Sequence, residues 1–201
     1  MAEKTIDIAS PILSRNERLA DQLRQRFDET GTYVINVLSS PGSGKTTTIL
    51  GTNEHLRDKA GLRCAVIEGD IASDVDAITM KEAGMPAIQI NTGGLCHLEG
   101  NMIMEAVDAF DQAVGLDNID VIFIENVGNL VCPVDFDLGE NLSIMILSVP
   151  EATTSPSSTR ASSSTLRAAA QQGRRAPAFD FDMDRYTKTL DDLNPQRRGL
   201  P

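Results

Sequence analysis

The sequence YVINVLSSPGSGKT, residues 33–46, runs from an apolar segment into a loop that contains two glycines. Residues 33–38 are mostly β-branched or apolar, which is typical of a strand that is buried on both faces. The loop matches the phosphate-binding pattern G-x-x-x-x-G-K-S/T, except that Ser39 replaces the first glycine. A helix through about Lys59 is expected next. A strand, this loop and a helix in succession predict a P-loop, and a chance glycine turn beside a lysine explains that order less well.

The loop contains the residue types that phosphate binding requires. Gly42 and Gly44 let backbone N–H groups turn toward an anion, and the start of a helix favours negative charge. Lys45 supplies a positive charge for the β- and γ-phosphates, and the hydroxyl of Thr46 is a ligand that suits Mg²⁺. The predicted nucleotide-binding residues of the loop are Ser40, Gly42, Ser43, Gly44, Lys45, Thr46 and Thr47.

Apolar strands and amphipathic helices alternate around this loop, which predicts an α/β fold with a mostly parallel sheet covered by helices on both faces. A helical segment is expected over residues 1–30, with its helix at 9–30, and a nucleotide-binding core over 31–150. Within the core the expected strands are 33–38, 63–67, 87–90, 121–124 and 142–149, and the expected helices after the first are 74–83 and 98–113.

Acidic residues follow two of the predicted strands, at Asp70 and Glu125, and Asp74 lies on the loop after Asp70. Strand ends are where ligand-binding residues gather in open α/β sheets, and Mg²⁺ prefers oxygen ligands. Asp70 and Glu125 are therefore predicted to complete a magnesium site with Thr46. Alternatively, each carboxylate only solvates the end of its strand.

A second candidate site contains sulfur and imidazole ligands. Cys96 and His97 are adjacent, and Cys132 lies on a later loop. Such ligands suit Zn²⁺ or Ni²⁺, and two copies of the chain facing each other would complete a four-coordinate site. Without a C-x-x-C pair, the residues alone favour the alternative of buried cysteines and a surface histidine.

Composition excludes several classes of protein. The chain has 201 residues and a formal charge of -11, so its surface disfavours nucleic acid and anionic lipid. No apolar run approaches the roughly 20 residues of a membrane helix. Three cysteines, an odd number, do not suit a disulfide scaffold and predict a reducing, cytoplasmic location.

Together these residues resemble the HypB-type hydrogenase nickel-incorporation proteins, which are P-loop GTPases of the SIMIBI class. The resemblance runs from about residue 8 to residue 150. It is carried by five blocks: LSSPGSGKTT (38–47), IEGD (67–70), GLCHL (94–98), ENVGNLVCP (125–133) and DFDLGE (135–140).

This resemblance implies a homodimeric GTPase that works with a nickel-delivery partner and the precursor of the hydrogenase large subunit. It implies that Cys96, His97 and Cys132 bind Ni²⁺ or Zn²⁺. Lys45 and Thr46 would bind phosphate and Mg²⁺, Asp70 and Glu125 would belong to the magnesium shell, and Gly128 would sense the γ-phosphate. Urease-type nickel GTPases are close relatives and remain an alternative.

The chain departs from the family after Glu151. Residues 151–178 form a low-complexity segment, and residues 179–201 resemble a truncated C-terminal part of the GTPase domain. In the family this position has the stretch Glu-Gly-Asp-Asp-Lys-Pro-Leu-Lys-Tyr-Pro. Codons for this stretch can be chosen so that deletion of one guanine nucleotide shifts the reading frame and yields EATTSPSSTR, the sequence of residues 151–160. We therefore expect compensating frame errors between Glu151 and Phe179 in the gene.

The family's guanine-reading sequence Asn-Lys-x-Asp is absent. Without its aspartate, the chain is expected to bind GTP weakly, to discriminate poorly against ATP and to be less stable. This leaves open a third function of a different class, a metal-binding scaffold whose nucleotide site is defective.

Overall fold

The computed structural model describes residues 9–70, 80, 83–147 and 166–170. The described strands are β1 (Tyr33–Ser39), β2 (Cys64–Asp70), β3 (Ala87–Asn91), β4 (Val121–Glu125), β5 (Leu142–Leu147) and β6 (Leu166–Ala170). The described helices are α1 (Ala9–Thr30), α2 (Lys45–Ala60) and α4 (Gly100–Val114), with short 3-10 turns at Leu116–Asn118 and Cys132–Asp135.

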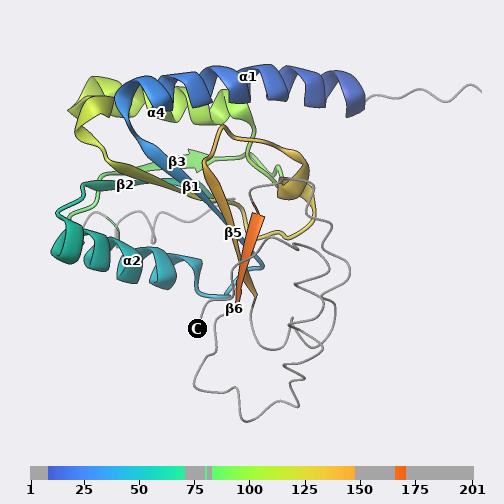
Figure 1. The fold of residues 1–201 in the computed structure, drawn as a ribbon. Helices are drawn as coiled ribbons and strands as arrows, with labels where there is room; N and C mark the ends of the chain where they lie inside the picture. Colours follow the sequence, from blue (N-terminus) through green and yellow to red (C-terminus); the bar gives the residue numbers. More distant parts are fainter. Residues whose placement is uncertain (1–8, 71–79, 81–82, 148–165, 171–201) are drawn as a thin grey trace, which may run out of the picture.

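These strands form one sheet in the order β3-β2-β4-β1-β5-β6, and every described pairing is parallel. Helices α1 and α4 cover one face of the sheet and α2 covers the other (Figure 1). The predicted α/β P-loop architecture is therefore confirmed. Because β1 lies between β4 and β5, the loop that follows β1 emerges at the middle of the sheet.

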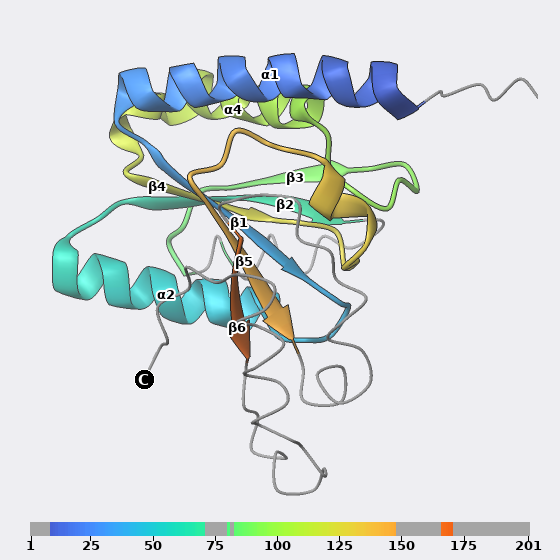
Figure 2. The same ribbon diagram turned by 45° about the vertical axis from the view of Figure 1, so that its right-hand side comes forward.

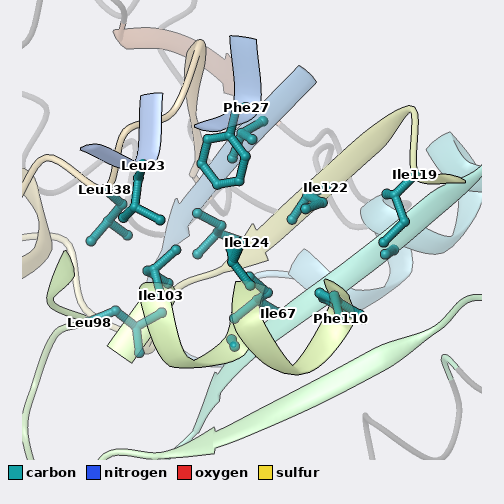
Figure 3. Packing of buried hydrophobic residues seen from close by; sticks show 14 of the residues in the cluster. Leu23, Phe27, Ile67, Leu98, Ile103, Phe110, Ile119, Ile122, Ile124 and Leu138 are labelled. Carbon is teal, nitrogen blue, oxygen red and sulfur yellow. The ribbon is translucent and has the colours of Figure 1, made fainter. Parts of the chain in front are cut away.

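The main hydrophobic core lies between the sheet and the α1/α4 layer. Phe27 and Leu23 of α1 contact the same cluster as Ile103 and Phe110 of α4, above the fully buried strand β4 (Figure 3). A second cluster, which includes Ile49 of α2 and the buried Cys64, fills the opposite face. Each face of the central strands is thus covered, as their continuous apolar sequences predict.

Most predicted elements agree with the structure to within one to three residues. Helix α1 spans Ala9–Thr30, the bounds that the sequence predicts. The predicted helix at 74–83 lies almost wholly outside the described residues, as do most of 151–178 and all of 179–201.

One strand lies where the sequence predicts none. Residues 166–170 form β6, which extends the edge of the sheet beside β5 within the low-complexity segment (Figure 2). A parallel edge ladder uses backbone N–H and C=O groups, which every non-proline residue supplies. Composition alone therefore does not exclude such a strand.

Candidate functional site

The loop between β1 and α2 has the backbone geometry that the P-loop pattern predicts. Gly42 and Gly44 adopt left-handed conformations, with φ of 73° and 90°, which side chains beyond glycine rarely tolerate. Helix α2 begins at Lys45, directly after Gly44. The first backbone N–H groups of this helix therefore face the end of the sheet, where an anion is favoured.

Lys45 is buried and is held by the residue that replaces the first glycine of the pattern. Its Nζ donates a hydrogen bond to Oγ of Ser39 over 3.0 Å, and its side chain lines the cavity above the loop. Ser43 and Ser40 brace the loop, because Oγ of Ser43 donates to the carbonyl of Ser40 over 3.0 Å. Thr47 is exposed and lines the same cavity.

The cavity has a volume of about 570 Å³ and is bounded by the P-loop, by β2 and by the segment that follows β4. This volume falls within the roughly 300–1,000 Å³ of typical small-molecule sites. The lining residues are Pro41, Gly42, Gly44, Lys45, Thr46, Thr47, Leu50, Glu68, Gly69, Glu125, Asn126, Val127 and Gly128. Most of the predicted residues of the P-loop and of the β4 end thus share one cavity, whereas the predicted Ser40 and Ser43 are not among its lining residues.

Oxygen ligands converge at one wall of this cavity. Oγ1 of Thr46 donates to Oε1 of Glu125 over 3.0 Å, and Glu125 is 5% exposed. Glu68, 2% exposed, pairs with Glu125 in the register of β2 and β4. A hydroxyl and two carboxylates form a donor set that fits Mg²⁺.

Glu68 lines the cavity although the sequence predicts Asp70, and not Glu68, as a magnesium ligand. Asp70 ends β2 and pairs with Asn91 of β3, and its side chain is outside the described part. Side chains two residues apart in a strand point to the same face. The choice of Asp70 therefore already implied that Glu68 faces the same way. Asp74 lies outside the described residues.

Gly128 lies in close contact with the P-loop. A Cβ added at Gly128 would lie 2.9 Å from Cγ of Pro41 and 3.1 Å from its backbone nitrogen. Only a glycine therefore lets the segment after β4 approach the phosphate loop this closely. The predicted sensor position is thus directly against the loop that would hold phosphate.

The three predicted soft-metal ligands lie on two neighbouring loops. Sγ of Cys96 lies 3.7 Å from Nδ1 of His97. A hydrogen bond between the side chains of Cys96 and Cys132, together with desolvation, raises the pKa of Cys96. All three side chains are partly exposed. Among the described residues no three His, Cys, Asp or Glu side chains are arranged to hold a metal ion.

Three residues with no predicted role in the site contact the candidate ligands on these loops. The ring of Phe136 stacks on His97 with centroids 3.9 Å apart, and Nε2 of His97 lies 3.4 Å from Oε1 of Glu99. Nδ2 of Asn129 donates to the carbonyl of Cys96 over 3.3 Å. No spacing in the sequence signals the contacts of Phe136 and Asn129, because they join loops that are far apart along the chain.

Cys64 is buried within β2, as its apolar surroundings in the sequence predict. Burial raises the pKa of its thiol to about 11. Within the described residues, no helix combines the length and the apolarity that crossing a membrane requires.

Residues 33–171 match the model of the CobW/HypB/UreG nucleotide-binding domain. The chain is 44% identical over 149 residues to the hydrogenase/urease maturation factor HypB of Helicobacter hepaticus, covering 74% of this chain and 60% of that protein. It is 47% identical over 153 residues to the hydrogenase maturation factor HypB of Azotobacter chroococcum, covering 76% of this chain and 48% of that protein. The chain therefore spans about half to three fifths of the length of these relatives.

Among solved structures, the chain is similar to HypB from Helicobacter pylori in complex with nickel. The TM-score is 0.82 at 34% sequence identity, and the match covers 90% of this chain and 83% of that one.

Proposed function

The chain belongs to the CobW/HypB/UreG nucleotide-binding family, and on that premise we propose that it is a GTP-hydrolysing nickel metallochaperone for the maturation of nickel–iron hydrogenase. The observation that carries the proposal is the segment 125–132. It begins with Glu125 beside Thr46, continues through Gly128 against Pro41 and ends at Cys132 beside Cys96. One stretch of eight residues thus contributes to both candidate sites.

In this proposal the nucleotide site positions GTP and stabilises charge as water attacks the γ-phosphate. The N–H groups of the P-loop and Nζ of Lys45 bind the phosphates. Thr46, Glu125 and Glu68 would hold Mg²⁺, with Asp70 nearby, and the ion would neutralise the developing charge on the phosphate oxygens. We expect slow hydrolysis, because no arginine or glutamine is among the described residues that line the cavity.

Nickel is the cargo in this proposal, and Zn²⁺ is the competing metal. Cys96, His97 and Cys132 would supply the ligands, and a second copy of the chain would complete the coordination. Leu95 and Val131, which flank these ligands, are 41% and 67% exposed. Exposed apolar side chains on both loops favour burial against another molecule, which supports a homodimer joined at this face.

Nucleotide and metal would then be linked through their shared segment, and such linkage is reciprocal. The test is titration of Ni²⁺ and Zn²⁺ into protein that is empty or loaded with a non-hydrolysable GTP analogue. The analogue should change metal affinity at least about fivefold, the lower end of typical coupling. Cys132→Ala should abolish both the site and its nucleotide dependence. Equal metal affinity with and without the analogue would contradict the proposal.

Phosphate release distinguishes the proposed GTPase from the alternative, a metal-binding scaffold without nucleotide turnover. Lys45→Ala should abolish release, whereas Lys59→Ala, at the exposed far end of α2, should leave it unchanged. An absence of release from the unmodified chain would favour the scaffold. Co-purification with a hydrogenase or a urease precursor separates the two nickel-delivery assignments.

A further inference from the structure

The side chain of Asn129 bridges the two loops that carry the candidate metal ligands. Its Nδ2 donates to the backbone carbonyl of Cys96 over 3.3 Å, and its Oδ1 accepts from the N–H of Val131 over 2.8 Å. One amide therefore touches the backbone of Cys96 and the residue that precedes Cys132. It also follows Gly128 directly in the chain.

The backbone on either side of Asn129 is tightly constrained. The N–H of Asn129 donates to the carbonyl of Val127 over 2.6 Å, which closes a tight turn around Gly128. Gly128 itself is in close contact with Pro41 of the P-loop. On the side that faces Pro41 there is no room for a side chain at Gly128, so a displacement of Pro41 toward Gly128 would press on the turn that contains Asn129.

The start of the segment is anchored in the sheet. Asn126 is 1% exposed and donates from Nδ2 to Oδ1 of Asn36 in β1 over 3.2 Å, while its backbone N–H donates to Val37. Oδ1 of Asn126 accepts from the N–H of Val127 over 3.0 Å. Because this end is fixed, movement at Gly128 is directed toward the part of the segment that carries Asn129 and Cys132.

We propose that Asn129 is a positioning residue that transmits the state of the nucleotide loop to Cys96, and through Cys96 to His97. Cys132 shares the segment with Gly128 and is connected to it through the backbone. Cys96 lies on another loop, where its backbone carbonyl accepts a hydrogen bond from the Asn129 amide and its side chain contacts Cys132. This inference rests on the proposed nucleotide-switched function, and it names the residue through which the nucleotide loop affects the metal ligands.

The difference between the two cysteines provides the test. Metal-free, full-length protein is labelled with iodoacetamide, with and without a non-hydrolysable GTP analogue, and the labelling rates of Cys96 and Cys132 are measured by mass spectrometry. The variant is Asn129→Asp, which keeps the acceptor for Val131 but places an oxygen opposite the carbonyl of Cys96. The matched control is Asn118→Asp, because Nδ2 of Asn118 likewise donates to a backbone carbonyl, that of Val114.

In the unmodified protein the analogue should change both labelling rates. In Asn129→Asp the response of Cys132 should persist, while the response of Cys96 should fall by about threefold to tenfold, the equivalent of one hydrogen bond. If the Asn129 side chain only stabilised the loops, the substitution would change the labelling responses of both cysteines together. Asn129→Ala, which also removes the acceptor for Val131, should weaken the Cys96 response as well, and titration of the analogue should give the unmodified affinity in each variant.

An unchanged Cys96 response in both Asn129 variants would overturn the inference and leave the proposed function intact. The same holds if only Cys132 responds in the unmodified protein. If neither cysteine responds there, no nucleotide signal reaches the metal loops, and both the inference and the proposed switch are wrong.

Discussion

Glu68 lies opposite Glu125 in the parallel register of β2 and β4, and both carboxylates are buried at the wall of the cavity that the P-loop bounds. Two carboxylates at one buried site repel each other, and a cation between them relieves that repulsion. Thr46 adds a hydroxyl to the same wall through its hydrogen bond to Glu125.

We therefore expect Glu125→Gln and Glu68→Gln each to weaken the stabilisation that Mg²⁺ adds to nucleotide-loaded protein. A tenfold loss of Mg²⁺ affinity corresponds to about 1.4 kcal/mol. The measurement is the melting temperature over a Mg²⁺ titration. Glu54→Gln, an exposed change on α2, is the control. If the melting temperature of Glu68→Gln depends on Mg²⁺ concentration as that of the unmodified protein does, Glu68 is not part of the magnesium site.

Gly128→Ala should displace the segment after β4 from the P-loop. The new methyl group would lie within 3.2 Å of three Pro41 atoms, two of them backbone atoms, so the loop must move. We expect about a tenfold loss of affinity for a GTP analogue, the cost of roughly one charge-assisted hydrogen bond. The control is Gly51→Ala, whose methyl group meets no heavy atom within 4 Å. That change in α2 should stabilise the protein by about 0.5–1 kcal/mol. Unchanged nucleotide affinity in Gly128→Ala would contradict the assigned contact.

Much of this site could be predicted because local sequence determines it. The P-loop needs particular residues in consecutive positions, so Gly42, Gly44 and Lys45 are visible as a pattern. The buried strands are visible as apolar runs. Glu68 was missed because it was interpreted as part of a strand end, although its two-residue spacing from Asp70 contained the signal.

Contacts between distant loops could not be predicted in this way. Asn129 meets Cys96 and Phe136 stacks on His97 only because the parallel sheet places the loops that follow β3 and β4 at the same edge, with β2 between the two strands. Strand β6 was also missed, since its pairing with β5 depends on backbone groups that every non-proline sequence offers.

Asn16→Ala should destabilise the protein and loosen the two metal loops. Asn16 of α1 is 5% exposed; its Nδ2 donates to the carbonyl of Asp137, and its Oδ1 accepts from the N–H of Gly100, each over 2.7 Å. The change would leave the buried N–H of Gly100 and the partly buried carbonyl of Asp137 without these bonds, at a cost of about 2–4 kcal/mol. Urea denaturation measures the loss. Gln25→Ala, an exposed change on the same helix, should cost less than about 0.5 kcal/mol. Equal denaturation midpoints for the two variants would contradict the bridging role.

Cys64 should make the fold sensitive to alkali. Burial raises the pKa of its thiol from 9.0 to about 11 in the folded protein, so the unfolded chain loses this proton first as the pH rises. The stabilising contribution is complete below pH 9 and is lost as the pH rises to about 11. Cys64→Val should remove this alkaline loss, which urea denaturation across that pH range would measure. At pH 8, iodoacetamide should label Cys132 well before Cys64. If the free energy of unfolding falls with rising pH in Cys64→Val as it does in the unmodified protein, another group causes the loss.

The departure from the family sequence after Glu151 predicts a loss of base selectivity. The resemblance implies that the aspartate of Asn-Lys-x-Asp reads guanine, and the chain has no such sequence. A buried charge-assisted hydrogen bond contributes about 1.5–3 kcal/mol, so the preference for GTP over ATP should fall about tenfold to a hundredfold. Isothermal titration with both nucleotides measures this ratio. The matched control is a chain whose gene is read one base later across residues 171–175, so that it encodes Asn-Lys-Val-Asp. Restored GTP preference in that control would assign the lost selectivity to the missing sequence. Tight, guanine-selective binding by the chain in its present sequence would contradict the predicted loss of selectivity. An unbroken reading frame in independent clones of the gene would contradict the frame-error explanation.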